Sequence, residues 1–313
     1  MKRTIVVGSA GQDGRLLTEH LTARGARIVG IQRNKTTYNG VEDMGHIDIT
    51  DADDVARSVK AIQPEAIYYL AAFHHSAQDL PLDDSSLLEK SRAVHVRGLD
   101  HFLAALAQDL DAPGRLFYAS SSLIFGNPAT EFQNEKTPFL PDDVYGRTKA
   151  EGVVLCRRYR AEQGVFAASG ILYNHESHYR GSHFVSKKII QEAVAIKRGK
   201  KDKLVLGDLG ARCDWGFAPD YVRAMRMILE LDTPDDFIIA TGETHSVLEF
   251  VQIVFEELDM NWEDHVTENP GLIRGKRPTL KGDSSRLRER TGWKPSLSFR
   301  EMVRRLLLAE LKG

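Results

Sequence analysis

The N-terminal stretch constrains the fold more than any other part of the chain. The apolar run Thr4–Val7 leads directly into Gly8, and a helical pattern follows over Arg15–Arg24. A continuous apolar run predicts a strand that is buried on both faces of a parallel sheet. Small residues between such a strand and a helix let the backbone approach a pyrophosphate, whose charge then faces the helix N-terminus. The candidate cofactor-binding residues in this turn are Gly8, Gly11, Gln12, Asp13 and Gly14.

Further apolar runs predict the rest of a parallel sheet. They cover residues 27–31, 47–49, 66–72 and 115–121, and helical patterns lie over Ser91–Gln108 and from Tyr145 to about Gln163. Strands that alternate with helices indicate βαβ units. We therefore expect an α/β fold, with a Rossmann-like doubly wound parallel sheet and a smaller C-terminal α/β substrate domain. The cofactor domain is predicted over residues 1–173, rejoined by roughly residues 213–241, and the substrate domain over residues 174–313.

The residues after the second predicted strand indicate which dinucleotide would bind. A NAD enzyme usually has an acid there for the ribose hydroxyls, but this chain has Arg33 in the segment Gln32–Lys35. Cations suit the extra phosphate of NADP, so NADP is predicted, with NAD or a solvated basic loop as alternatives. Asp48 could accept a hydrogen bond from adenine or cap the helix that starts near Asp51. Further candidate cofactor contacts are Ile49, Leu70, Ala71 and Ala72.

Tyr145 and Lys149 carry the predicted chemistry. Residues four apart lie on one face of a helix, and an ammonium near a phenol favours the phenolate, so the pKa of Tyr145 is expected to fall from ~10. Such a phenol can take a proton from a sugar hydroxyl or return it. Ser121, at the end of a predicted strand, offers a neutral hydroxyl to a substrate oxygen. The alternatives are a surface pair at helical spacing and a serine that only ends a strand.

The bulk properties exclude several classes of protein. The chain has 313 residues and a formal net charge of −2, which favours neither a nucleic-acid binder nor a membrane-surface protein. No apolar run approaches the ~20 residues of a membrane-spanning helix. Cys156 and Cys213 have no metal-ligand spacing and fit a reducing cytoplasm. His74 and His75 are adjacent, and adjacent residues rarely chelate one ion, so we predict no metal and expect His74 to contact the substrate.

These motifs together resemble an extended short-chain dehydrogenase/reductase, and specifically the GDP-mannose 4,6-dehydratase branch. The resemblance covers nearly the whole chain and rests on Gly11–Gly14, Gly170–Ser177, Arg180-Gly181, Phe184–Ile189 and Asp214–Val222. It implies that Asn174 and Lys188 bind a nucleotide sugar and that Ser121, Tyr145 and Lys149 perform redox chemistry on the sugar. It also implies a homodimer, with a tetramer as the alternative. The candidate substrate-binding residues are His74, Ser121, Ser122, Leu123, Asn174, Val185, Lys188, Arg212 and Arg277.

The chain also departs from the pattern of that branch. Leu123 replaces the glutamate that serves the dehydratases as the acid/base for removing water across C5 and C6, and a leucine cannot move a proton. The Lys-Arg-Asp-Trp of the family has become Arg212–Trp215, which displaces a phosphate-binding arginine by one position. The segment after Arg277-Pro278 lacks a family glutamate, and the loop after Arg33 is shorter than in the dehydratases.

The missing glutamate favours one reaction over another. We expect an NADP-dependent enzyme that acts at C4 of a nucleotide sugar, most simply a GDP-sugar, as a dehydrogenase, ketoreductase or epimerase. The alternative is a GDP-mannose 4,6-dehydratase in which His74, Glu131 or Glu135 supplies the acid. A remote alternative is a non-catalytic dinucleotide sensor, which would have no need of Ser121, Tyr145 and Lys149. The expected setting is cytoplasmic synthesis of a polysaccharide precursor.

Overall fold

The computed structural model describes residues 3–33, 41–42, 47–73, 82–108, 114–272 and 279–312. Within these ranges the main sheet consists of β1 (Arg3–Val7), β2 (Arg27–Ile31), β3 (Val41–Glu42), β4 (Ala66–Tyr69), β5 (Arg115–Ser121), β7 (Ala167–Leu172) and β12 (Asp236–Ile239). All of its strands are parallel, in the order β12-β7-β5-β4-β1-β2-β3. The order reverses at β1, and ligands of such sheets bind at the carboxyl ends of the strands beside the reversal. The predicted doubly wound sheet is confirmed.

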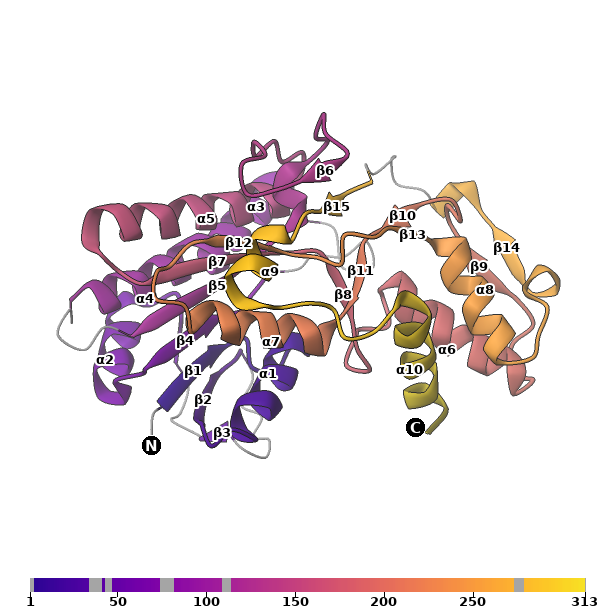
Figure 1. Ribbon diagram of the computed structural model, residues 1–313, viewed down its shortest axis with the longest axis horizontal. Coiled ribbons are helices and arrows are strands. Elements are labelled where there is room, and N and C mark those ends of the chain that lie inside the picture. The colour runs from indigo at the N-terminus through magenta and orange to yellow at the C-terminus, as the bar shows by residue number, and fades with distance from the viewer. Residues whose placement is uncertain are drawn as a thin grey trace.

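Helices cover both faces of this sheet (Figure 1). One face packs on α2 (Ala52–Ile62), α4 (Gly98–Ala107) and α5 (Val144–Gln163), and the other on α1 (Gln12–Thr22) and α7 (Ala218–Leu229). The side chains of β1 alternate between the two cores, since Ile5 and Val7 join the first and Val6 joins the second. A strand between two helical layers needs apolar residues on both faces, which explains the unbroken run in the sequence.

The strand predicted at Ile47–Ile49 is wrong. These residues form no strand in the described chain, and the short β3 pairs with β2 instead. Asp48 closes a turn here, because its Oδ1 accepts hydrogen bonds from the N–H and the hydroxyl of Thr50, at 2.9 and 2.7 Å. The helix cap is Asp51, whose side chain accepts a backbone N–H of the first turn of α2. Asp48 is therefore not the cap of this helix.

The helix predicted over Ser91–Gln108 begins earlier and is not uniform. It starts as α3 (Asp84–Arg92), continues through a π-helical turn at Ala93–Arg97 and ends as α4. A π turn adds one residue to a helical turn and shifts the face that the following residues present. The turn places His95 at 0% exposure, directly beside α5.

A second core lies in the C-terminal part of the chain. It is formed by α6 (Val185–Lys197), α8 (Val247–Glu257) and α10 (Phe299–Lys312), with side chains such as Ile190, Phe250 and Leu306 buried between them. Figure 1 shows these helices beyond the end of the main sheet. The division of the chain into domains at residues 173 and 174 stays a prediction.

Among the described residues, four short strand pairs lie outside the main sheet. They are β8 (Asn174–Glu176) with β11 (Trp215–Phe217), β10 (Arg212–Cys213) with β13 (His245–Ser246), β9 (Leu204–Leu206) with β14 (Val266–Glu268), and β6 (Phe132–Gln133) with β15 (Lys281–Gly282). The last helix of the first core, α9 (Ser285–Thr291), packs on β12. The strand β11, which contacts α10, runs directly into α7, and α7 packs on α1. The second core is therefore connected to the face of the sheet that α1 and α7 cover.

Candidate active site

The carboxyl ends of β1 and β4 meet at the glycine turn. Gly8 adopts φ +89°, and a Cβ there would come within 2.8 Å of the backbone nitrogen of Ala71. A Cβ at Gly14 would lie 2.3 Å from the Gly8 carbonyl oxygen, so both positions require glycine. The N-cap of α1 is Gly11, and no side-chain hydrogen bond from this N-cap position caps the helix among the described residues. The first turn of α1 thus presents uncapped N–H groups, which fit the pyrophosphate of a dinucleotide.

The side chains of Gln12 and Asp13 point away from this cradle. The Gln12 amide donates to the His175 carbonyl oxygen at 3.1 Å and accepts from the Ser177 hydroxyl at 2.9 Å. Both carboxylate oxygens of Asp13 lie 3.0 to 3.1 Å from His175 Nε2. Two residues predicted to contact the cofactor are thus joined by their side chains to the segment 175–177. Their cofactor contacts stay a prediction.

The predicted Tyr145 and Lys149 lie on the first turns of α5, next to the end of β5. Lys149 is only 2% exposed, and its Nζ donates to the Ala119 carbonyl oxygen at 2.8 Å. The same nitrogen lies 5.7 Å from the centre of the Tyr145 ring and 5.1 Å from that of Tyr118. A surface pair, the alternative interpretation of this spacing, does not match such burial.

Burial dominates the protonation of both groups. It raises the pKa of Tyr145 to about 12, although the Arg180 guanidinium opposes the rise, and it lowers the pKa of Lys149 to about 7. The expected fall in the pKa of Tyr145 is therefore wrong for the protein alone. The reason is that burial of the Tyr145 hydroxyl itself disfavours the charged phenolate, and the nearby Asp13 and Asp143 carboxylates add to the rise.

His95 supports Tyr145 from the other side. Its Nε2 accepts the backbone N–H of Phe73 at 2.9 Å, so Nδ1 carries the proton and donates to the Thr148 hydroxyl at 2.7 Å. The imidazole also meets the Tyr145 ring edge-on, with ring centres 5.2 Å apart. Sequence reasoning missed this residue, because nothing in the sequence signals the π turn that carries it.

Ser121 and Leu123 lie together at the end of β5. The Ser121 hydroxyl accepts the Leu123 N–H at 3.3 Å and caps a 3₁₀ turn over Ser122–Phe125. A Cβ on Gly146 would lie 2.4 Å from the Leu123 carbonyl oxygen, so Leu123 abuts the residue that follows Tyr145. The structure therefore brings Leu123 beside the predicted catalytic tyrosine.

The carboxylates proposed as substitutes for the missing glutamate are bound elsewhere. Glu135 accepts the Ile238 backbone N–H at 2.9 Å. Glu131 is 77% exposed and lies 3.5 Å from the Lys281 ammonium. The third candidate, His74, lies outside the described residues. The described geometry therefore offers neither glutamate as a ready acid beside Tyr145.

The predicted substrate residues come from several elements. Asn174 begins β8 and is exposed, and Val185 begins α6 at 37% exposure. The Lys188 ammonium donates to the Val205 carbonyl oxygen at 2.7 Å. Arg277 lies outside the described residues. Substrate contacts by these residues, and cofactor contacts by Arg33, Asp48, Ile49, Leu70 and Ala72, stay predictions.

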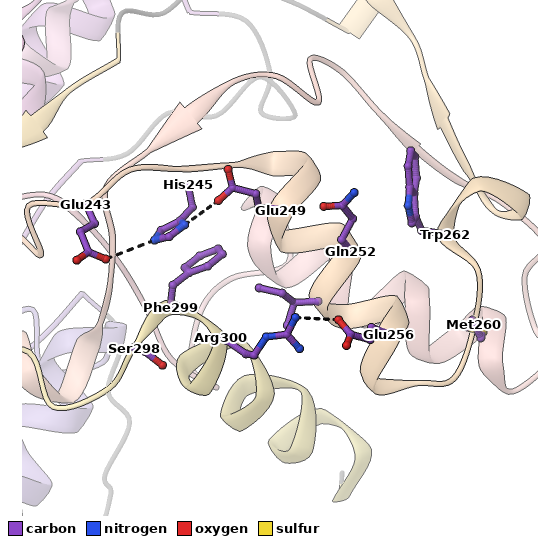
Figure 2. Close-up of a pocket in the computed structure, with 11 residues that line it drawn as sticks. Glu243, His245, Glu249, Gln252, Glu256, Met260, Trp262, Ser298, Phe299 and Arg300 are labelled. Atoms are coloured by element: carbon purple, nitrogen blue, oxygen red, sulfur yellow. Dashed lines mark hydrogen bonds and ion pairs between the residues drawn. The ribbon is translucent and has the colours of Figure 1, made fainter.

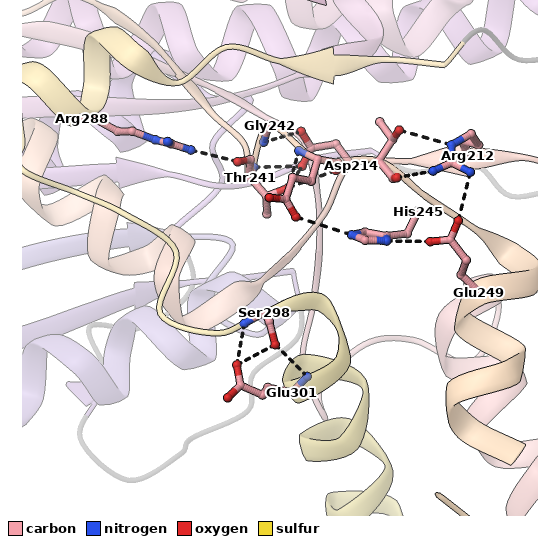
Figure 3. Close-up of polar contacts among 11 residues, drawn as sticks. Arg212, Asp214, Thr241, Gly242, His245, Glu249, Arg288, Ser298 and Glu301 are labelled. Carbon is pink, nitrogen blue, oxygen red and sulfur yellow. Dashed lines mark hydrogen bonds and ion pairs between the residues drawn. The ribbon is translucent and has the colours of Figure 1, made fainter. Parts of the chain in front are cut away.

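Arg212 is held by its own chain. Its guanidinium pairs with Glu249 at 3.1 Å and donates to the hydroxyl and carbonyl oxygens of Thr244 (Figure 3). In the same region, buried Asp214 accepts backbone N–H groups of Thr241 and Gly242, at 2.9 and 3.0 Å. This network ties Arg212 of β10 and the adjacent Asp214 to the residues between β12 and β13.

A hollow of about 750 Å³ opens on the second core, between α8 and the start of α10. His245 stacks on Phe299 there at 3.8 Å between ring centres, and Arg300 pairs with Glu256 at 2.8 Å (Figure 2). Among the described residues, none of those predicted for the site lines this hollow. Glu249, which pairs with the predicted substrate residue Arg212, is part of its lining.

Membrane-spanning helices and metal-binding clusters are both absent from the part of the chain that the structure describes. Across the described ranges, no helix is long and apolar enough to cross a membrane. The same part of the chain contains no group of three or more His, Cys, Asp or Glu side chains that could hold a metal ion.

Comparison with known proteins places the chain in a family. A model of the family described as GDP-mannose 4,6 dehydratase matches residues 5–306. The chain belongs to the GDP-mannose 4,6-dehydratase family. Its sequence is 34% identical to that of GDP-mannose 4,6 dehydratase 1 of Arabidopsis thaliana. The alignment covers 99% of this chain and 90% of that protein. As the resemblance predicted, this chain is an enzyme of the extended short-chain dehydrogenase/reductase class.

Solved structures agree on the fold of this family member. RMD from Pseudomonas aeruginosa, complexed with NADPH, is similar at a TM-score of 0.81 and 18% identity, covering 100% of this chain and 99% of that one. The UDP-glucose 4-epimerase of Thermus thermophilus, in complex with NAD, is similar at a TM-score of 0.80 and 22% identity over 99% of both chains. At these identities the likeness supports the fold alone.

Proposed function

We propose that this protein transfers hydride at C4 of a nucleotide-activated sugar, with a GDP-sugar as substrate and a nicotinamide dinucleotide as cofactor. The observation that carries the proposal is Tyr145 with Lys149 beside the end of β5, in a chain of the GDP-mannose 4,6-dehydratase family. Oxidation at C4 gives a 4-keto sugar, and reduction reverses it. A 4,6-dehydratase performs the same first step, so the proposal holds for both candidate reactions.

The chain's own residues divide the work at C4. Tyr145 takes the proton of the C4 hydroxyl or returns it, and Ser121 holds the C4 oxygen by a hydrogen bond. Gly8, Gly11 and Gly14 hold the pyrophosphate of the cofactor, and Asn174 and Lys188 hold the diphosphate of the sugar nucleotide. When bound, the cofactor supplies the hydride acceptor or donor, and the positive charge of its oxidised ring favours the phenolate of Tyr145.

The choice of cofactor rests on Arg33. A cation after the second strand suits the 2′-phosphate of NADP, so we propose NADP ahead of NAD. The similar structures include one with NADPH and one with NAD, which supports either dinucleotide. Titration with NADPH and with NADH compares their dissociation constants and so tests which dinucleotide is preferred. If Arg33 binds the 2′-phosphate, an Arg33→Glu variant should bind NADH more tightly than NADPH.

A second candidate is loss of water to a 4-keto-6-deoxy sugar. The family match and the names of the relatives favour this reaction more than they favour a C4 dehydrogenase, ketoreductase or epimerase. Leu123 favours the reaction without water loss, because general acid–base help is worth ~10²–10⁴ in rate and Leu123 offers none. Glu131 and Glu135, bound elsewhere, do not replace it.

Mass spectrometry of GDP-mannose after incubation with the protein and NADP separates the two reactions. Loss of the mass of water identifies a dehydratase. Loss of two hydrogens identifies a C4 dehydrogenase. An unchanged mass with an altered C4 configuration, read by NMR, identifies an epimerase. A panel of 4-keto GDP-sugars with NADPH tests the reductive direction.

Tyr145→Phe is the control for all of these outcomes. It removes the hydroxyl that moves the proton and keeps the ring that packs on His95. Turnover should be lost while the cofactor still binds. Normal turnover in Tyr145→Phe contradicts the roles given above. Dinucleotide binding with no turnover of any GDP-sugar by the native protein would favour a sensor.

A further inference from the structure

Two segments that are far apart in the sequence interlock beside the glycine turn. Gln12 and Asp13, on the first turn of α1, bind His175 and Ser177 at and beyond β8 through side-chain hydrogen bonds of 2.9 to 3.1 Å. The contact therefore joins the element that faces the cofactor phosphates to the strand that begins with Asn174.

The Asp13–His175 contact is an ion pair between a buried imidazole and a partly buried carboxylate. His175 is 8% exposed, its Nδ1 lies 2.6 Å from the Tyr173 carbonyl oxygen, and its Nε2 faces the Asp13 carboxylate. Both ring nitrogens face acceptors, so both carry protons and the ring is an imidazolium. Burial alone would lower the pKa of His175, but the Asp13 carboxylate holds it above its usual value. The ring also stacks on Tyr221 of α7, with centres 4.5 Å apart, which fixes its plane.

Because of the neighbouring charges, the protonated state of His175 depends on the Asp13 carboxylate. The Arg180 guanidinium lies near both, favours the Asp13 carboxylate and disfavours the His175 imidazolium. Arg180 itself pairs with Glu176, which follows His175 in β8, at 3.1 Å. A shift of α1 that moves Asp13 would thus move His175 and, with it, Asn174 on the same three-residue strand.

We propose that the Asp13–His175 contact couples the two ligands of this enzyme, so that a bound dinucleotide raises the affinity for the sugar nucleotide. A pyrophosphate on the first turn of α1 fixes Gln12 and Asp13, and these side chains fix β8 in the position that Asn174 needs. By linkage, the sugar nucleotide raises the affinity for the dinucleotide by the same factor. This inference rests on the proposed function, because it takes Asn174 as a contact of the sugar nucleotide.

The test measures binding and not turnover. The charge of Asp13 also raises the pKa of Lys149, so a kinetic effect of Asp13→Asn would not separate coupling from catalysis. We would titrate GDP into the native protein by calorimetry, without and with saturating NADPH or NADH, whichever binds more tightly. GDP and a reduced dinucleotide do not react together. The dinucleotide should tighten GDP binding about tenfold, within the ~5- to 150-fold range usual for coupled sites.

Two variants break the contact and one serves as a matched control. Asp13→Asn removes the charge at nearly constant shape, and His175→Phe keeps the stack on Tyr221 without the polar contacts. Asp236→Asn changes a different ion-paired carboxylate, which is buried and pairs with Arg157 and Arg160 at the opposite end of the sheet. In Asp13→Asn, in His175→Phe and in the double variant, the dinucleotide should change the dissociation constant of GDP less than twofold. In Asp236→Asn it should change that constant as much as in the native protein. If Asp13→Asn does not fold, His175→Phe alone tests the contact. Ser177→Ala, which removes the donor to Gln12 and the acceptor of the Tyr179 N–H, then tests the neighbouring link between α1 and the residues after β8.

Each result has a distinct meaning. Loss of coupling in the two contact variants, with both ligands still bound, supports the inference. GDP and dinucleotide that both bind the native protein but bind independently overturn it, as does coupling that survives in Asp13→Asn and His175→Phe. If GDP does not bind at all, the proposed sugar-nucleotide site is wrong and the inference is overturned with it.

Discussion

Lys149 should make the stability of this protein rise with pH. It is 2% exposed, and burial takes its pKa from the usual 10.5 to about 7. The gap between 10.5 and 7 corresponds to about 5 kcal/mol of differential stability between the charged and neutral forms. The folded-state pKa lies below the unfolded one, so the unfolded chain binds more protons between these values and the free energy of unfolding increases as pH rises.

The assay compares the wild type with Lys149→Met, which carries no charge at any pH. Urea unfolding without added cofactor, followed by tryptophan fluorescence, gives the difference in free energy of unfolding from about pH 7 to about pH 9.5. Over this range the free energy of unfolding of the wild type should rise by about 3 kcal/mol relative to that of the variant, because the cost of burying the Lys149 ammonium disappears as it loses its proton. Lys149→Arg stays charged at every pH of this range, so the free energy of unfolding of the wild type should rise by the same amount relative to Lys149→Arg.

A flat difference would refute the reasoning. It would mean that Lys149 keeps its proton in the folded protein with an ordinary pKa and holds a full positive charge near Tyr145. A rise seen against Lys149→Met but not against Lys149→Arg would show that another group titrates.

Three further changes follow from the structure. Gly14→Ala places a Cβ 2.3 Å from the Gly8 carbonyl oxygen, so it should cost about 1–3 kcal/mol of stability by thermal unfolding and weaken dinucleotide binding at least tenfold by calorimetry. Burial, with Arg24 and Arg226 nearby, lowers the pKa of His20 from 6.5 to about 4. Stability is thus lost as pH falls from 6.5 towards 4, and His20→Gln should flatten that loss in acid unfolding curves. If absence of an acid blocks water loss, Leu123→Glu should increase dehydrated product at least tenfold by mass spectrometry, and no increase would contradict that role.

The elements predicted well were those with a strong local pattern. The run Thr4–Val7 is apolar throughout because both faces of β1 are covered, and the glycines after it are required by close backbone contacts. Ile47–Ile49 misled because its apolar residues flank Asp48, whose side chain bonds Thr50 and bends the chain. The true β3 has only two residues, too few for any periodicity.

The site was predicted less completely because part of it depends on long-range contacts. Tyr145 and Lys149 are four residues apart, so their proximity could be inferred from helical spacing, but the burial that reverses the expected pKa of Tyr145 could not. Asp13 and His175 are separated by 162 residues, and no local pattern indicates that they pair. His95 was missed because a lone histidine in an amphipathic helix gives no sign that it faces a neighbouring helix.

Position 123 shows how fold and reaction can separate within one family. The structure requires the backbone of this residue, since its N–H bonds Ser121 and its carbonyl oxygen lies against Gly146 beside Tyr145. Neither contact involves the side chain, which is half-buried. The turn can therefore accept leucine or glutamate with the same backbone. Whole-chain similarity depends on the backbone and on both cores, and it assigns the family. In the function that we propose, the choice between water loss and hydride transfer alone turns on the side chain at position 123.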